Sequence, residues 1–157
     1  MSGARYVVVP ASAVPARTRR AAEAAVSFAA VDLELTPPPT IVWYDDLPPT
    51  AAEMSAAMGT SLPTPAPPPD SFEMDQRIRG RVLDTQAVWL HAWAGASRTA
   101  QTALHETVHV FQHRLQGPAR NRAEYQGREV QATDYADGLA EVAEVIANTM
   151  RGAPDHA

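Results

Sequence analysis

The chain has five histidines, and three of them stand in one short segment, TALHETVHVFQH at residues 102–113. His105 and His109 are four positions apart, so on a helix they share one face and lie roughly 6 Å apart along the axis. Two imidazoles at this spacing can each give one nitrogen to the same Zn²⁺ ion. Glu106 lies beside that face, where its carboxylate reaches a metal-bound water without binding the metal. The motif therefore predicts a site with one zinc ion in which Glu106 is the general base.

A helix predicted over about residues 99–115 must position these groups, and Gly117 with the following proline ends it. His113 lies about 12 Å along the axis from His105, too far for these two imidazoles to share one ion. Two roles remain open for His113, capping of the helix C-terminus or exposure to solvent. The core stripe of this helix is predicted from apolar residues at helical spacing, namely Leu104, Val108, Phe111 and Leu115.

A third ligand must come from another element, because a catalytic zinc site usually has three protein ligands and one open position. The chain has no cysteine, so this ligand is a nitrogen or an oxygen. A long helix predicted over about residues 122–150 carries Glu129 at the head of a stripe of alanines. Small side chains let another helix approach closely, which makes Glu129 the predicted third ligand. Glu124, nearer the turn at Gly117, is the alternative.

The segment HETVH, followed by EVQATDYA at residues 129–136, resembles the gluzincin metallopeptidases. It is most similar to the minimal gluzincins of bacteria and phages. Their second motif reads roughly Glu-x-x-Ala-x-x-aromatic-Ala. The resemblance covers roughly residues 86–145. It implies that His105, His109 and Glu129 bind zinc and that Glu106 is the general base.

The same resemblance implies the reaction, which is hydrolysis of a peptide bond in a peptide or protein substrate by a zinc-activated water. It also implies that Asp134 orients a ligand imidazole, although this aspartate stands one position later than in the family pattern. Four residues are candidates for stabilising the oxyanion, namely Tyr125, Arg128, Tyr135 and His91. The strand predicted at 87–93 could pair its edge with an extended substrate. Trp89 and Trp93 could line the cleft, pack in the core or meet a partner.

The order of predicted elements, strand, helix, strand, one or two strands and two helices, indicates an α+β class. The runs that predict them are 5–10, 18–35, 41–44 and 78–93, followed by the two helices above. In the strand before the HExxH helix, Val88, Leu90 and Ala92 face one way and Trp89, His91 and Trp93 the other. We expect a single small zincin-like domain over 1–157, with a short mixed sheet whose edge strand packs on the HExxH helix. The proline-rich segment 47–70 is a surface loop or a lid, with a short helix at 51–58.

Composition limits the classes of partner. The net charge is −5 and all thirteen basic residues are arginine, with no dense cationic cluster of the kind that nucleic-acid binding needs. No apolar run approaches the roughly eighteen residues of a membrane span, and no secretory signal is visible. A cytoplasmic location is therefore the default expectation, and the oligomeric state is not indicated.

Two other functions stay open at the level of sequence. The first is a zinc-containing but non-catalytic structural or regulatory module of phage or prophage type, for which Glu106 would be unnecessary. The second is a regulatory protease that cuts a DNA-bound repressor, which needs a partner-binding domain not visible in the sequence. A zinc-dependent endopeptidase or related amidase accounts best for the glutamate of the motif.

Overall fold

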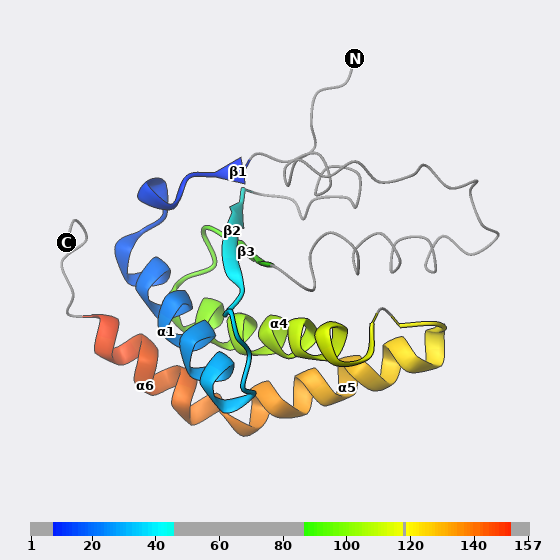
Figure 1. Ribbon diagram of the computed structural model, residues 1–157. Helices are drawn as coiled ribbons and strands as arrows, with labels where there is room; N and C mark the ends of the chain where they lie inside the picture. The colour runs from blue at the N-terminus through cyan, green and yellow to red at the C-terminus, as the bar shows by residue number, and fades with distance from the viewer. Residues whose placement is uncertain (1–7, 46–86, 118, 152–157) are drawn as a thin grey trace, which may run out of the picture.

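The computed structural model describes residues 8–45, 87–117 and 119–151, which form a small sheet with helices packed along one side of it (Figure 1). The elements in chain order are β1 (Val8–Val9), a 3-10 turn (Ala11–Ala13), α1 (Ala16–Asp32), β2 (Thr40–Tyr44), β3 (Ala87–His91), α4 (Ala96–Gln116), α5 (Arg122–Gly138) and α6 (Ala140–Arg151). This arrangement confirms the α+β class. Some predictions lie outside the described residues. They are those for residues 5–7, for the strand before residue 87, for the segment 47–70 and for the helix at 51–58.

The sheet is mixed, with strand order β1-β2-β3. β1 runs antiparallel to β2, and β2 runs parallel to β3, so that Trp43 lies between Val9 and Leu90. The first four residues of β3 are all buried, and only His91 at its end is partly exposed. Trp89, on the opposite face from Leu90, is therefore covered as well. Among the described residues β3 is an edge strand, and it packs on α4 as predicted.

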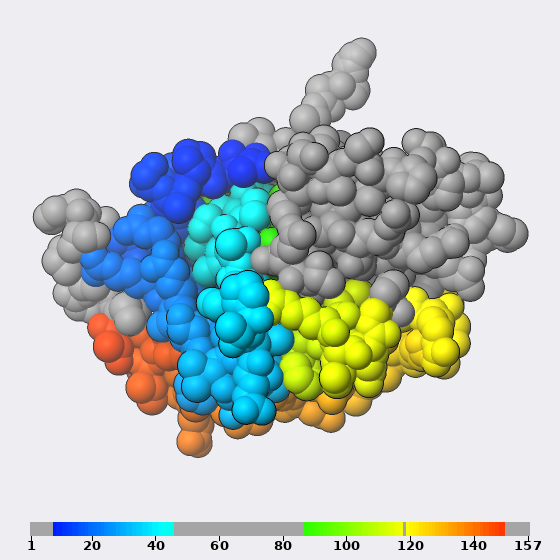
Figure 2. Space-filling view, viewed as in Figure 1, coloured from blue at the N-terminus to red at the C-terminus, as the bar shows by residue number. Residues whose placement is uncertain are grey.

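Alanines bring α1 close to its neighbours. Its inner face consists of small side chains that solvent does not reach, namely Ala21, Ala22, Ala25 and Ala29. Without longer side chains between them, the backbones of α1, α4 and α6 can approach closely, and α1 contacts both other helices. On the side of the molecule seen in Figure 2, α1 and the segment after it lie at the surface, and the C-terminal part of α4 reaches the surface beside them.

The HExxH helix is longer than predicted and its core stripe is shorter. α4 begins at Ala96 rather than 99, directly after Gly95, whose φ of 88° suits a residue without a side chain. It ends at Gln116, where Gly117 with φ of 75° donates its N–H to the carbonyl of His113. Leu104 is fully buried, but Leu115 is 66% exposed. The prediction that Leu115 belongs to the core is wrong, because the last turn of α4 extends past the elements that cover Leu104.

The single long helix predicted at 122–150 is in fact two helices. α5 ends at Gly138, and Leu139 (φ −108°, ψ 20°) separates it from α6. Glycine has a low helix propensity, and Leu139 turns its side chain to the core. The break lets α6 pack against both α1 and α4, which a straight continuation of α5 would not allow.

None of the helices that the structure describes has the length and apolar character needed to cross a membrane.

We expect Leu104→Ala to lower the free energy of unfolding by about 2–5 kcal/mol, because it leaves a cavity in a core that has no exposure to solvent. Leu115→Ala, the same change on the exposed end of the same helix, should cost less than about 0.5 kcal/mol. Urea denaturation followed by circular dichroism measures both. Equal losses for the two variants would contradict the placement of the core along α4.

Candidate metal centre

The two histidines of the motif lie together on one face of α4. Their Nε2 atoms are 3.1 Å apart, and their rings meet edge to face with centroids separated by 4.8 Å. The side chain of His109 is 12% exposed and that of His105 is 22% exposed. Both ring nitrogens are thus turned to one point near the surface, as the four-residue spacing predicts.

Glu129 brings the third donor from α5. One carboxylate oxygen lies 2.6 Å from His109 Nε2 and the other lies 3.3 Å from His105 Nε2. Ala132 and Ala136, which follow Glu129 along α5, are buried, and α5 packs against α4. The alanine stripe therefore has the effect expected from the sequence, which is to let the glutamate reach the histidines of the neighbouring helix.

The three donors lie close enough to bind one metal ion. Their ligand atoms are all within 4.8 Å of one another. Donors about 2.0–2.1 Å from a tetrahedral ion stand roughly 3.4 Å apart, and the separations of 3.1 and 3.3 Å at His105 are near that value. The 2.6 Å between Glu129 and His109 Nε2 is shorter, so an ion shared by these two donors requires them to move apart. The same residues without an ion form a network of hydrogen bonds.

Gln112, whose role the sequence did not predict, fixes the orientation of His109. Its Oε1 lies 2.8 Å from His109 Nδ1, so this oxygen accepts the Nδ1–H. The proton on Nδ1 leaves the Nε2 lone pair directed to the other donors. A hydrogen bond of this kind also makes the imidazole a better metal ligand. The only sequence signal was a glutamine three residues after a candidate ligand, which is too common a pattern to be specific.

The amide nitrogen of Gln112 connects this histidine to α5. It donates to the carbonyl of Arg128 at 3.0 Å and to Oε1 of Gln131 at 2.8 Å, and Gln112 itself is 2% exposed. These two acceptors flank Glu129 in the sequence. One buried side chain therefore sets the ring of His109 and the part of α5 that presents the carboxylate.

The charges of the site suit a cation. Hydrogen bonds from His105 and His109 hold the pKa of the Glu129 carboxylate well below its usual range. Burial disfavours the charged form of His109, but the hydrogen bond to Glu129 and the charges of Glu106 and Glu129 outweigh it and raise its pKa to about 9. In the metal-free protein a proton therefore sits on this imidazole at neutral pH, and a metal ion must displace it.

Glu106 lies beside the donors without being one of them. Its nearest carboxylate oxygen is 3.9 Å from His105 Nε2, and its side chain is 36% exposed. A carboxylate at that distance is outside the group of three donors and close to one of them. The role of Glu106 as general base stays a prediction.

His113 is buried rather than exposed to solvent. Its Nδ1–H donates to the carbonyl of His109 at 3.0 Å, and the residue is 6% exposed. Burial lowers the pKa of His113 to about 4, so this imidazole is neutral at physiological pH. The expectation of solvent exposure is wrong, because the start of α5 packs against this last part of α4. Its hydrogen bond goes to an interior carbonyl of the helix instead of capping the terminus.

Two further acidic residues are not part of the centre. Glu124 accepts two hydrogen bonds from the Arg120 guanidinium, at 3.0 and 2.7 Å, and this lowers the pKa of its carboxyl. It is therefore engaged at the start of α5 and is not the third donor. Asp134 is exposed, and the imidazole of His109 is oriented by Gln112 instead. The role that the resemblance implied for Asp134 is not seen in the described residues.

The candidates for an oxyanion partner separate into two pairs. Arg128 donates to the carbonyl of Gly117 at 2.6 Å, and Tyr135 donates to Asp32 at 2.8 Å, so both side chains hold helices together. Tyr125 is half-buried on α5, one helical turn before Glu129. Tyr125 therefore remains as a prediction for this role, and His91 lines a cavity with Arg98 and Thr99 at the N-terminal half of α4.

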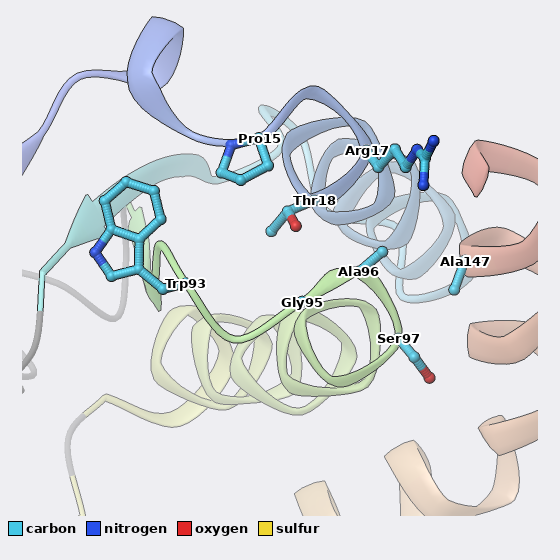
Figure 3. A pocket seen from close by; sticks show the side chains of 8 residues that line it. All are labelled: Pro15, Arg17, Thr18, Trp93, Gly95, Ala96, Ser97 and Ala147. Atoms are coloured by element: carbon cyan, nitrogen blue, oxygen red, sulfur yellow. The ribbon is translucent and has the colours of Figure 1, made fainter. Parts of the chain in front are cut away.

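A cavity of about 560 Å³ lies near the N-terminal ends of α1 and α4, where Pro15, Thr18 and Ala96 line it (Figure 3). None of the three donors borders it. Trp93 also lines this cavity; it is 46% exposed and its indole N–H donates to Asp45. Trp89 is buried in β3. Lining of a substrate cleft by either tryptophan stays a prediction.

Comparisons of the chain with protein-family models, with curated proteins and with solved structures find no match. The geometry of the three donors is thus the main observation on which a function can be argued.

We expect the affinity for zinc to rise about tenfold per pH unit between pH 7 and 9 and then to level off. Below the raised pKa of His109, of about 9, binding displaces one proton, and above it no proton is displaced from this group. Chelator competition across this range measures the affinity, and calorimetry in two buffers of different ionisation enthalpy counts the protons. An affinity that is flat above pH 6.5 would show that His109 keeps its ordinary pKa.

Gln112→Leu should weaken zinc binding by about 10- to 100-fold, because the proton of His109 loses the acceptor that keeps it on Nδ1. Gln116→Leu, on the exposed last turn of the same helix, is the matched control and should bind as the wild type does. Zinc dissociation constants are compared at equal folded fraction, checked by thermal melting. If Gln112→Leu keeps full affinity in a folded protein, Gln112 does not position the ligand.

Proposed function

We propose that this chain is a zinc metallopeptidase of gluzincin type, which hydrolyses a peptide bond in a peptide or protein substrate. The observation that carries the proposal is the meeting of His105 and His109 on α4 with Glu129 from α5, with Glu106 beside them. Two histidines spaced for one ion and a carboxylate from the next helix, 2.6 Å from one of them, supply the three donors that such an enzyme needs.

Zinc is the ion that best fits the donor set. Two imidazole nitrogens and one carboxylate oxygen are typical of catalytic zinc sites, which leave a fourth position for water or substrate. Among the residues that the structure describes, the group contains three donors and no fourth. A zinc ion there would supply Lewis acidity, which lowers the pKa of a water molecule towards 7 and polarises a carbonyl group.

Glu106 is suited to move the proton. Its carboxylate is half-exposed and stands 3.9 Å from a donor nitrogen, close enough to face a reacting water without taking a ligand position. As general base it would take a proton from the attacking water and then give it to the leaving amine. A metal site with a purely structural role has no need of such a carboxylate.

Backbone pairing of an extended substrate with β3 stays a prediction. β3 is the edge of the sheet in the described part of the chain, and it packs on α4. Its first four residues are buried, so this pairing requires the edge to become accessible.

We expect Glu106→Gln to keep zinc and to lose about 10²- to 10⁴-fold in kcat on peptide substrates, because the amide cannot accept the proton. His109→Ala should lose both zinc and activity. Elemental analysis gives the metal content, and an unbiased peptide library followed by mass spectrometry gives the activity. Glu141→Gln, an exposed glutamate on α6, is the control that should change neither.

A wild-type protein that carries zinc and cuts no peptide in the library would contradict the peptidase. The better interpretation would then be a non-catalytic zinc module.

A further inference from the structure

A second cavity, of about 280 Å³, lies between the end of β3 and the N-terminal half of α4. Most of the residues that line it have polar side chains, namely Tyr44, His91, Arg98, Thr99 and Thr102. It is distinct from the cavity of Figure 3, with which it has none of these residues in common. None of the three candidate metal donors lines this cavity, so metal binding does not explain its polar side chains.

Two polar atoms in the lining are buried without a partner. Neither Nε2 of His91 nor Oγ1 of Thr99 has a hydrogen-bond partner among the residues that the structure describes, and Thr99 is 1% exposed. A buried hydroxyl or ring nitrogen without a partner costs free energy, and a water molecule or a ligand can supply that partner. Both residues line the cavity, and a hydroxyl or a ring N–H can donate a hydrogen bond to a ligand.

Arg98 is the charged residue in the lining of the cavity, and Glu144 of α6 accepts a hydrogen bond from the neighbouring Ser97. Arg98 is exposed in the first turn of α4 and forms no ion pair with the residues that the structure describes. The first turn of α4 contains no acidic residue, so the positive end of the helix dipole is not neutralised from within the helix. Asp45, which follows Tyr44, accepts a hydrogen bond from Trp93. An arginine with hydroxyl and imidazole donors suits an anionic group, and on a peptide that group is a carboxylate.

The cavity is aligned with the metal donors. Arg98, Thr102, His105 and His109 follow one another at intervals of four, three and four residues, so they form one stripe along α4 within about 60° of one another. Seven residues of helix separate Arg98 from His105, which corresponds to about 10 Å. An extended peptide covers that length with about three residues, at 3.3 Å each.

We propose that this cavity is a substrate subsite that binds a carboxylate of the peptide, two to three residues from the bond that is cut. Arg98 pairs with the carboxylate, and Thr99 and His91 donate hydrogen bonds to it. This subsite rests on the proposed peptidase function and adds to it a preference for acidic substrates. The carboxylate comes either from an aspartate or glutamate side chain or from a free C-terminus at that distance.

The experiment compares zinc-loaded wild type, Arg98→Gln and Arg98→Glu on matched peptides. One set carries glutamate, glutamine or lysine at each position near the cut bond, and a second set ends there with a free or an amidated C-terminus. We expect the wild type to prefer the carboxylate by about 10- to 100-fold in kcat/KM, mainly through KM. Arg98→Gln should lose the preference and Arg98→Glu should reverse it towards lysine. The set that shows the effect identifies the source of the carboxylate.

Both variants should fold, since a glutamate in the first turn of a helix is favourable. Arg122→Gln, an exposed arginine at the start of α5, is the control that should keep the preference. Thr99→Val gives a second test, because it removes the buried hydroxyl at nearly constant shape. It should raise the melting temperature while it weakens the carboxylate preference, whereas a hydroxyl with only a structural role would leave the preference unchanged.

Failure of the subsite is distinguishable from failure of the peptidase. Cleavage without a preference for acidic peptides, or a preference that survives in Arg98→Gln, overturns the subsite and leaves the peptidase intact. If the wild type cuts nothing, fluorescence anisotropy with the same peptides, carrying a fluorescent label, measures their binding and tests the subsite directly. Tighter binding of the acidic peptide that depends on Arg98 supports the subsite, and equal binding of the acidic and neutral peptides overturns it.

Discussion

The contact between α4 and α5 is the constraint on which the rest of the site depends. Gln112 lies in this contact with both ends of its amide in use, one to His109 and the other to Arg128 and Gln131. Loss of one of these partners leaves a buried polar group unpaired, so the three hydrogen bonds stabilise one another. These hydrogen bonds fix the ring of His109 and the part of α5 on either side of Glu129.

The remainder of the core keeps this contact in place. Alanines allow α1 to approach α4, and the break after Gly138 lets α6 pack on both. Polar contacts tie the outer edges, with Tyr135 of α5 donating to Asp32 of α1 and Arg128 donating to the carbonyl at the end of α4. The helix that bears the histidines is thus held from three sides, and its donor face is left toward the surface.

The centre and the polar cavity beside it follow from one feature of α4, its long polar stripe. The stripe begins with a cation at Arg98 and reaches the metal donors at His105 and His109. In the proposed peptidase, a substrate lying along it would meet a positive group first and the three candidate metal donors about three residues later. Binding energy from the first contact would then help to hold the peptide bond in front of Glu106, which is how remote contacts contribute to catalysis.

The sequence by itself determined the spacing of the donors on α4, the choice of Glu129 and the α+β class, because helical periodicity and the alanine stripe are local properties of the chain. It did not determine that Gln112 orients His109, that Leu115 is exposed, that His113 is buried, or that the C-terminal helix breaks at Gly138. Each of these depends on which elements lie next to α4 in space. Hydrogen bonds and burial between residues far apart in the chain are set by packing, and only the tertiary structure shows them.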